Sequence, residues 1–393
     1  MVTPLQRCWL WNAAAVGSTP APGHEAGGAR VTALRFPDSD RNTGEPALLA
    51  VALDNGGLKV YDVVRACRRS GRSGGSTVGA DHAATASTPT VLDAVGTVAH
   101  LRSVTPDAAA APAVVHHIAW SPEQSQVLAT AGDDRLVRVW DLRDAKRLVQ
   151  TLEMPGGEHA DLAWSPRSAV YLAAPRRQPR GSISFMDMRV PRRLLKTFSY
   201  GTCIGTVQWT PDEELFCMAY GGTGVEMMLW PSLKSVHFHP VNEPLPGVAA
   251  VSDLAFRIHP SGRQLACGNE YGLVSVVELA TLQPQYVLQR LRSPVKQLRW
   301  SAAVSTAADT PGHHFLAACG ALPEWDSDVE VAAVEATEGP PADTTYGAAM
   351  LPRTVQLDAP GGCIALDWHP QRPLLAYASL SDTFIRFIGS PDG

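Results

Sequence analysis

Hydrophobic and polar residues follow one another in short runs along most of the chain, and turn residues bound each run. The stretch 118–143, IAWSPEQSQVLATAGDDRLVRVWDLR, is the clearest example. Its apolar runs at 118–120, 127–130 and 136–142 are separated by Ser-Pro and Gly-Asp-Asp, which favour turns. The third run alternates apolar and polar side chains with the period of two that a half-buried strand requires. This stretch therefore predicts three consecutive β-strands.

The same unit recurs along the chain. An aromatic residue followed by a turn, usually with proline, marks the end of an apolar strand at Phe36, Trp120, Trp164, Trp209, Phe256, Trp300 and Trp368. The intervals between these anchors are 84, 44, 45, 47, 44 and 68 residues, so four of the six lie close to one period. A period of about 40–45 residues with several short strands in each unit is typical of β-propeller blades. The seven anchors predict an all-β fold with seven blades.

The unit at 118–143 also resembles a WD repeat, because Trp140-Asp141 stands at the end of its third strand. This resemblance implies a seven-bladed WD40 β-propeller. In WD blades a turn aspartate, an inner-strand Ser or Thr, an opening histidine and the tryptophan form a buried hydrogen-bond network. Such a network specifies packing and not reactivity. We interpret four residues in this way, as a structural blade network: His100, Asp133, Asp134 and Trp140.

Residues 1–393 are expected to form a single propeller domain. The last repeat has three strands of its own, and the alternating run at about 6–12 can supply the fourth, so an N-terminal strand is expected to close the ring. Closure removes the exposed sheet edge that invites aggregation. Segments rich in Gly, Ala, Ser, Thr or Pro interrupt the strand pattern, and we interpret them as flexible surface inserts at about 65–97, 301–313 and 337–352.

Composition narrows the class of protein. The net charge of −5 argues against nucleic-acid binding over the whole surface, although local basic patches remain open. The 7 cysteines contain no C-x-x-C and fall mostly in predicted strands, which suits reduced core thiols in a cytosolic or nuclear protein. The first residues lack the long apolar region of a signal peptide, and no stretch approaches the roughly 20 apolar residues of a membrane span. No membrane contact is expected.

The chain lacks the short motifs that usually carry catalysis. It has no phosphate-binding loop, no G-x-S-x-G elbow and no H-E-x-x-H zinc motif. His116-His117 and His237-Phe238-His239 have no partner ligands at the spacing of a metal site, so we interpret them as structural. We therefore predict no catalytic residue, no metal ligand and no cofactor, and we expect the chain not to be an enzyme.

Arginines gather at two places. One group, Arg65, Arg68, Arg69 and Arg72, lies in the first insert, and a denser group surrounds the third repeat and includes Arg189. Arginine on a rigid scaffold suits phosphate or carboxylate groups, so the second group is our candidate for contact with RNA or an acidic partner. The alternative is that exposed loops are simply charged. The candidate contacts are Arg176, Arg177, Arg180, Arg192 and Arg193.

Trp140-Asp141-Leu142-Arg143 also fits the W-D-x-R box of propellers that act as substrate receptors of cullin-RING ubiquitin ligases. This resemblance implies that Asp141 and Arg143 would form an adaptor-binding box, with the arginine reaching the adaptor. The alternative is an ordinary solvent-facing arginine after a strand.

Six longer phrases carry a more specific resemblance. They are VRVWDLR (137–143), GSISFMDMR (181–189), LKSVHFHP (233–240), HPSGRQLACGNEYGLVSVVEL (259–279), RLRSPVKQLRWS (290–301) and ALDWHPQRPLLAYAS (365–379). They resemble the family of WD-repeat subunit 3 of the THO complex, over roughly residues 115–390. The match is weaker in the first repeat, where family members lack an insert like 65–97.

The resemblance implies a non-enzymatic scaffold subunit of THO/TREX in the nucleus, acting in mRNP assembly and in mRNA export coupled to transcription. The implied partners are other THO subunits, above all the large helical scaffold subunit. The RNA-export helicase and adaptor would be indirect partners, and RNA a weak one. The alternative function is a substrate receptor of a cullin-RING ubiquitin ligase.

Overall fold

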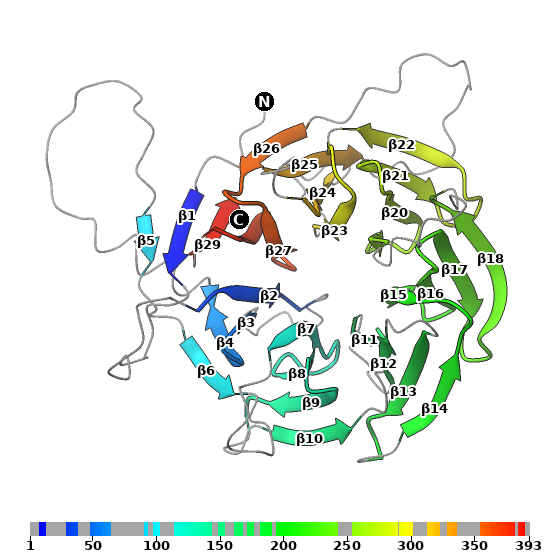
Figure 1. The fold of residues 1–393 in the computed structure, drawn as a ribbon, viewed down its shortest axis with the longest axis horizontal. Helices are drawn as coiled ribbons and strands as arrows, with labels where there is room; N and C mark the ends of the chain where they lie inside the picture. The colour runs from blue at the N-terminus through cyan, green and yellow to red at the C-terminus, as the bar shows by residue number, and fades with distance from the viewer. Residues whose placement is uncertain are drawn as a thin grey trace, which may run out of the picture.

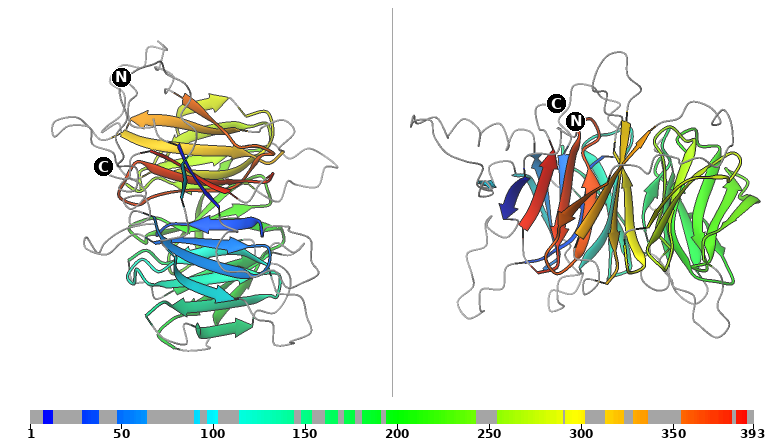
Figure 2. Two further views of the ribbon diagram at one scale, coloured as in Figure 1. Left: turned by 90° about the vertical axis from the view of Figure 1, so that its left-hand side faces the viewer. Right: turned by 90° about the horizontal axis from the view of Figure 1, so that it is seen from above.

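A computed structural model of the chain shows seven β-sheets arranged as the blades of a ring (Figure 1). Seen from the side, the ring is a disc, and its strands run between the two faces (Figure 2). The prediction of an all-β, seven-bladed WD40 β-propeller is confirmed. The structure describes residues 8–12, 29–37, 48–63, 90–92, 97–102, 114–143, 148–153, 161–167, 171–176, 181–190, 194–242, 254–289, 291–301, 313–322, 328–335, 354–381 and 384–389.

The first four blades follow the chain in order. Blade 1 consists of β2 (Val31–Arg35), β3 (Leu48–Leu53), β4 (Gly57–Asp62) and β6 (Thr97–Arg102). Blade 2 consists of β7 (Val115–Trp120), β8 (Val127–Gly132), β9 (Leu136–Asp141) and β10 (Leu148–Glu153). Blade 3 consists of β11 (Ala163–Trp164), β12 (Tyr171–Arg176), β13 (Ser182–Asp187) and β14 (Leu194–Ser199). Blade 4 consists of β15 (Ile204–Trp209), β16 (Leu215–Tyr220), β17 (Gly224–Leu229) and β18 (Lys234–Pro240).

The last three blades complete the ring. Blade 5 consists of β19 (Phe256–Ile258), β20 (Gln264–Gly268), β21 (Leu273–Glu278) and β22 (Pro284–Gln289). Blade 6 consists of β23 (Val295–Trp300), β24 (His313–Gly320), β25 (Asp328–Glu335) and β26 (Thr354–Asp358). Blade 7 combines β27 (Cys363–Trp368), β28 (Leu374–Ser379) and β29 (Phe384–Gly389) with β1 (Cys8–Asn12) and β5 (Thr90–Leu92).

The two ends of the chain meet in blade 7. β1 pairs antiparallel with β29 from Cys8 opposite Ile388 to Asn12 opposite Phe384, so a strand from the N-terminus closes the ring, as expected (Figure 1). β5, a three-residue strand, pairs in parallel with the outer side of β1. It lies inside the insert expected at 65–97, of which most residues fall outside the described part of the chain. The same holds for residues 302–312 and 337–352 of the two later inserts.

The hydrophobic core lies between the blades. The buried residues of the described chain form seven clusters, and each combines side chains from two neighbouring blades. Between blades 3 and 4, Phe185, Trp209, Phe216 and Trp230 pack with ring centroids 4.8–6.3 Å apart. The inner strands of a blade therefore need apolar residues on both faces, because one face meets the blade before and the other meets the blade after.

Indole hydrogen bonds link the innermost strands of successive blades. Trp120 Nε1 donates to the carbonyl of Arg35 at 2.9 Å, and Trp164 Nε1 donates to the carbonyl of Ala119 at 3.0 Å. Trp300 and Trp368 make the same bond to the residue that precedes the anchor of the blade before. This bond recurs at four tryptophan anchors and explains why a tryptophan is favoured there, whereas Trp209 Nε1 has no such partner among the described residues.

The anchor of the fifth repeat is Ile258, so the sequence-based choice of Phe256 was wrong. The carbonyl of Arg257 accepts the bond from Trp300 at 3.2 Å, which places Ile258 in the position of Trp120. The His-Pro turn follows Ile258 directly, as Ser-Pro follows Trp120. The position requires an apolar side chain that fills the interface between blades, and a buried isoleucine meets that requirement.

In the described chain, no helix is long and apolar enough to cross a membrane.

The aromatic cluster between blades 3 and 4 gives a direct test of this packing. Phe216→Ala is expected to lower the free energy of unfolding by about 3–5 kcal/mol, because it leaves a cavity among the packed rings. Phe238→Ala on β18 is the matched control, since Phe216 is 0% exposed and Phe238 is 43% exposed. Urea unfolding followed by tryptophan fluorescence measures both. Equal losses in the two variants would contradict a core located between the blades.

Candidate functional site

The WD-type residues of blade 2 make short contacts within that blade. Trp140 Nε1 on β9 donates to Thr130 Oγ1 on β8 at 2.9 Å, and both side chains are buried. In the turn between the two strands, Asp134 Oδ2 lies 2.6 Å from Arg138 Nη2. These contacts stabilise the β8–β9 hairpin and engage Trp140 and Asp134 within the blade.

The other two residues of the expected network lie apart from this hairpin bond. Asp133 Oδ1 lies 2.6 Å from His116 Nε2, and both side chains are about half exposed. His100 lies in β6, the outermost strand of blade 1, where its backbone pairs with Lys59. The side chain of His100 is outside the described part of the structure. The structure therefore brings Asp133, Asp134 and Trp140 to one blade but in separate contacts.

Asp133 and Asp134 have different environments, so their substitutions should lower the free energy of unfolding by different amounts. Asp134→Ala is expected to lower the free energy of unfolding by about 3–5 kcal/mol, because it removes the carboxylate that compensates the buried charge of Arg138. Asp133→Ala breaks a solvent-exposed pair, so a loss of about 0–1 kcal/mol is expected. Chemical denaturation of the two single variants checks this. A larger loss for Asp133→Ala than for Asp134→Ala would contradict it.

The W-D-x-R box forms a local turn. Asp141 Oδ1 accepts from the backbone N–H and from Nε of Arg143, each at 2.9 Å, and Arg143 Nη2 donates to Asp141 Oδ2 at 2.8 Å. The hydrogen bond from the Arg143 side chain holds the pKa of Asp141 below its usual value. Blade 3 repeats the arrangement, with Arg189 bonded to both carboxylate oxygens of Asp187. The box therefore describes a turn that recurs after the third strand of a blade.

The candidate RNA-contact group surrounds β12 and β14 of blade 3. Arg176 is the last residue of β12, but its side chain lies outside the described part of the structure. Arg177, Arg180, Arg192 and Arg193 lie wholly outside it. The role of these five arginines in contact with RNA or an acidic partner stays a prediction.

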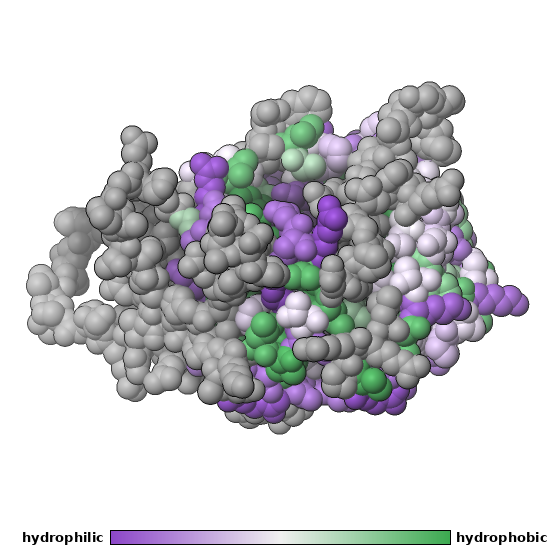
Figure 3. All heavy atoms as spheres, turned by 60° about the horizontal axis from the view of Figure 1, so that its bottom comes forward, coloured by the Kyte–Doolittle hydropathy of each residue, from purple (hydrophilic) through white to green (hydrophobic). Residues whose placement is uncertain are grey.

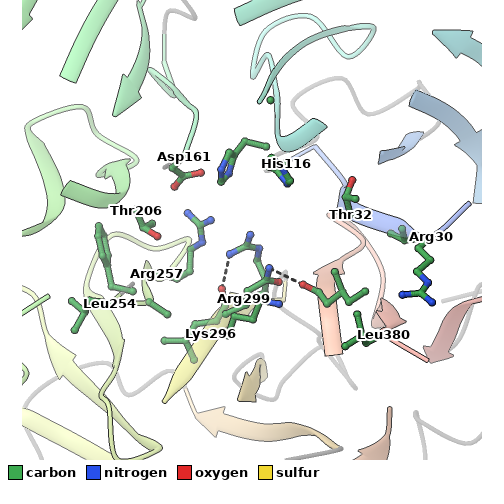
Figure 4. A pocket seen from close by; sticks show the side chains of 18 of the residues that line it. Arg30, Thr32, His116, Asp161, Thr206, Leu254, Arg257, Lys296, Arg299 and Leu380 are labelled. Atoms are coloured by element: carbon green, nitrogen blue, oxygen red, sulfur yellow. Dashed lines mark hydrogen bonds between the residues drawn. The ribbon is translucent and has the colours of Figure 1, made fainter. Parts of the chain in front are cut away.

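The described residues of the ring surround a central channel with a cavity toward each face. One cavity has a volume of about 540 Å³ and is lined by residues from the beginnings of the innermost strands, among them Arg30, Thr32, His116 and Lys296 (Figure 4). The other has a volume of about 550 Å³ and lies among the proline turns at the ends of those strands. Arg257 and Arg299 line both cavities, so they lie at the middle of the channel.

Three arginines and one carboxylate meet there. Arg299 Nε lies 3.4 Å from Asp367 Oδ1, and Arg35 Nη1 lies 3.8 Å from the same oxygen. Asp367 Oδ2 also accepts from the backbone N–H of Phe36 at 2.7 Å. Asp367 therefore connects blades 6, 7 and 1 at the place where the ring closes. Burial, and then the positive charges of Arg257 and Arg35, lower the pKa of Arg299 well below its usual value.

These channel residues were not among the candidates chosen from the sequence. All occupy the position directly before an anchor, where the seven repeats carry Arg35, Ala119, Ala163, Gln208, Arg257, Arg299 and Asp367. Three arginines at one repeat position are a usable signal, but only once the fifth repeat is aligned on Ile258. With Phe256 as the anchor, the residue at this repeat position is Ala255, and Arg257 does not align with the other two arginines.

Two histidines hold turns at the proline side of the channel. The backbone N–H of Ser261 donates to His259 Nδ1, and that of Gln371 donates to His369 Nδ1, each at 3.1 Å. These bonds require an unprotonated Nδ1, so both turns need the neutral imidazole. Burial lowers the pKa of His259 to about 3 and that of His369 to about 4.

The buried histidines predict a loss of stability in weak acid. A lowered folded-state pKa means that the unfolded chain binds protons below about pH 6.5 while the folded chain does not. Stability is therefore complete above pH 6.5 and falls as the pH drops toward 4. His369→Asn keeps an acceptor for the turn and should reduce the stability difference between pH 7 and pH 5 by about 1–2 kcal/mol. Chemical denaturation of the unchanged chain and of His369→Asn at both pH values measures this difference, and an equal difference in the two proteins would contradict the prediction.

Within the described ranges, no three His, Cys, Asp or Glu side chains are grouped as a metal site. On the side of the ring shown in Figure 3, the apolar residues drawn in colour form small groups separated by hydrophilic ones. The channel brings together charged side chains from blades 1, 5, 6 and 7.

The fold and the repeats define a WD-repeat β-propeller. Its backbone is similar to the β-propeller domain of Cps50 (Swd1) from Myceliophteria thermophila, with a TM-score of 0.59, 14% identity, and coverage of 92% of this chain and 96% of that one. At this identity, the likeness concerns the fold alone.

Sequence comparisons agree with a WD-repeat relationship. The chain is 25% identical over 266 residues to THO complex subunit 3 of Arabidopsis thaliana, which covers 67% of this chain and 71% of that protein. It is 24% identical over 166 residues to the WD repeat-containing protein AAC3 of Dictyostelium discoideum, covering 42% of this chain and 33% of that protein. The family described as eukaryotic translation initiation factor eIF2A matches residues 104–225, which span blades 2 and 3 and the first strands of blade 4.

Proposed function

We propose that this chain is a non-enzymatic scaffold subunit of the THO/TREX complex, acting in the nucleus in mRNP assembly and in mRNA export coupled to transcription. The observation that carries the proposal is the similarity to THO complex subunit 3 over 67% of the chain. The six phrases that resemble this family lie in blades 2 to 7, so the resemblance follows the repeats. Its partners would be other THO subunits, above all the large helical scaffold subunit.

The architecture is suited to a scaffold. Seven buried interfaces hold the blades in one rigid ring, and the turns and outer strands are displayed around it. Recognition residues on loops and edges work best when a rigid framework fixes their positions. The side chains in blade 2 that a motif search would select, Trp140 and Asp134, are occupied by contacts inside that blade.

Blade 4 offers an edge where a protein partner could dock. β18, which carries the family-like phrase LKSVHFHP, is the outermost strand of its sheet and has exposed side chains along nearly its whole length. Two apolar residues of this strand, Val236 and Phe238, are 40% and 43% exposed. An exposed edge with apolar side chains is a site where another chain can pair or pack. We assign this edge to the large helical THO subunit.

The first experiment is purification of the tagged full chain from nuclear extract, with and without nuclease, followed by mass spectrometry. THO subunits that remain after nuclease treatment would support a scaffold held by protein contacts. Val236→Asp with Phe238→Asp is expected to reduce their recovery by about tenfold or more, because charges replace the apolar contacts of the edge. Val149→Asp, on the outer strand of blade 2, is the matched control and should retain them.

Two outcomes would contradict the proposal. One is nuclease-resistant recovery without any THO subunit. The other is recovery of a cullin adaptor that Arg143→Ala abolishes, which would favour the substrate-receptor function. Equal recovery with the edge variant and with Val149→Asp would leave the complex in place but remove β18 as its docking edge.

A further inference from the structure

Three arginines from distant parts of the sequence converge in the channel. Arg35 comes from β2, Arg257 from β19 and Arg299 from β23, which are the innermost strands of blades 1, 5 and 6. Figure 4 shows the side chains of Arg257 and Arg299 extending side by side into the middle of the pocket. The innermost strands of a propeller approach one another at the axis, so this repeat position concentrates positive charge there.

The carboxylates of the channel are engaged in holding the ring. In the cavity on the proline side, the lining contains the three arginines and one carboxylate, Asp367, which also binds the backbone of Phe36. In the other cavity, Asp161 accepts from the backbone N–H groups of Leu162 at 2.8 Å and Val207 at 3.3 Å. The lining of this cavity combines four cationic side chains with two carboxylates, Asp54 and Asp161, and the proline-side lining combines three arginines with one carboxylate, so both carry an excess of positive charge.

This excess is partly removed from water. The Arg299 side chain is 17% exposed, and Arg35 and Arg257 are buried. The repulsion among the three groups lowers the pKa of Arg299, after burial itself. An oxyanion placed between guanidinium groups turns this repulsion into attraction, and it can accept two parallel N–H bonds from one arginine.

We propose that the central channel is an oxyanion-binding site for an acidic protein segment, whose carboxylate or phosphorylated side chain is held between Arg257 and Arg299. The segment enters at the mouth that carries Arg30 and Lys296, which attract it before contact. The cavity of about 540 Å³ at this mouth has room for one extended side chain and its flanking backbone. The inference does not rest on membership of the THO complex.

The charge pattern favours a protein segment over a nucleic acid. Asp54 and Asp161 lie in the same lining as Arg30 and Lys296, so this mouth combines both signs of charge, whereas a phosphate chain favours a continuous basic surface. The only aromatic carbocycle in that lining is Phe256, which is 1% exposed and offers no face for a base. Single-stranded nucleic acids are usually held by exposed aromatic residues along a basic groove.

The test measures fluorescence anisotropy of a labelled ten-residue peptide of alternating Glu and Gly with the purified full chain. A second peptide carries phosphoserine in place of Glu, so the two arms distinguish carboxylate from phosphate. Arg257→Gln and Arg299→Gln are each expected to weaken binding by about tenfold to a hundredfold, because each removes a charge-assisted hydrogen bond. Arg263→Gln, an exposed arginine on blade 5, should bind like the unchanged chain.

A thermal melt accompanies each variant. The melt separates a loss of binding from a loss of folding. Arg257→Lys keeps the charge but not the planar fork, and should weaken binding less than Arg257→Gln. Absence of binding to both peptides, or equal binding by Arg257→Gln and Arg263→Gln, would overturn the proposal. Tighter binding of a ten-nucleotide RNA that is lost in Arg257→Gln would also overturn it.

Discussion

The packing of each blade against its neighbours is the interaction on which the structure depends. No blade encloses a core of its own, since the buried clusters all combine two blades. Every sheet must therefore be apolar on both faces, and the ring must close for the first and last blades to be covered. The pairing of β1 with β29 and the contacts of Asp367 meet that requirement at the same place.

This constraint determines where polar side chains can carry out recognition. The faces of the blades pack against one another in the core. Side chains that bind a partner must therefore lie in the turns, on the outer strands or in the channel. Polar residues at the turns form contacts within the turn itself, as the Asp141–Arg143 and Asp187–Arg189 pairs show. The outer strand β18 displays exposed side chains, and the channel brings three arginines close together.

The two proposed surfaces would serve different kinds of contact. An exposed apolar edge such as β18 suits a broad protein–protein interface, where buried area and packing provide affinity. A recessed charged channel suits one side chain and provides specificity through its shape and charge. A scaffold that uses both can hold a constitutive partner at its rim while its axis recognises a short segment of another protein.

The sequence by itself determined the fold class and the number of blades, because a repeat of aromatic anchors and alternating strands is a local signal present in each unit. It also predicted the closing strand, from an unpaired last repeat. Only the tertiary structure showed that Ile258 is an anchor, because the interface requires an apolar side chain and not an aromatic ring. The arginine cluster was decided in the same way: Arg35, Arg257 and Arg299 are far apart in the chain, and only closure of the ring brings their charges together.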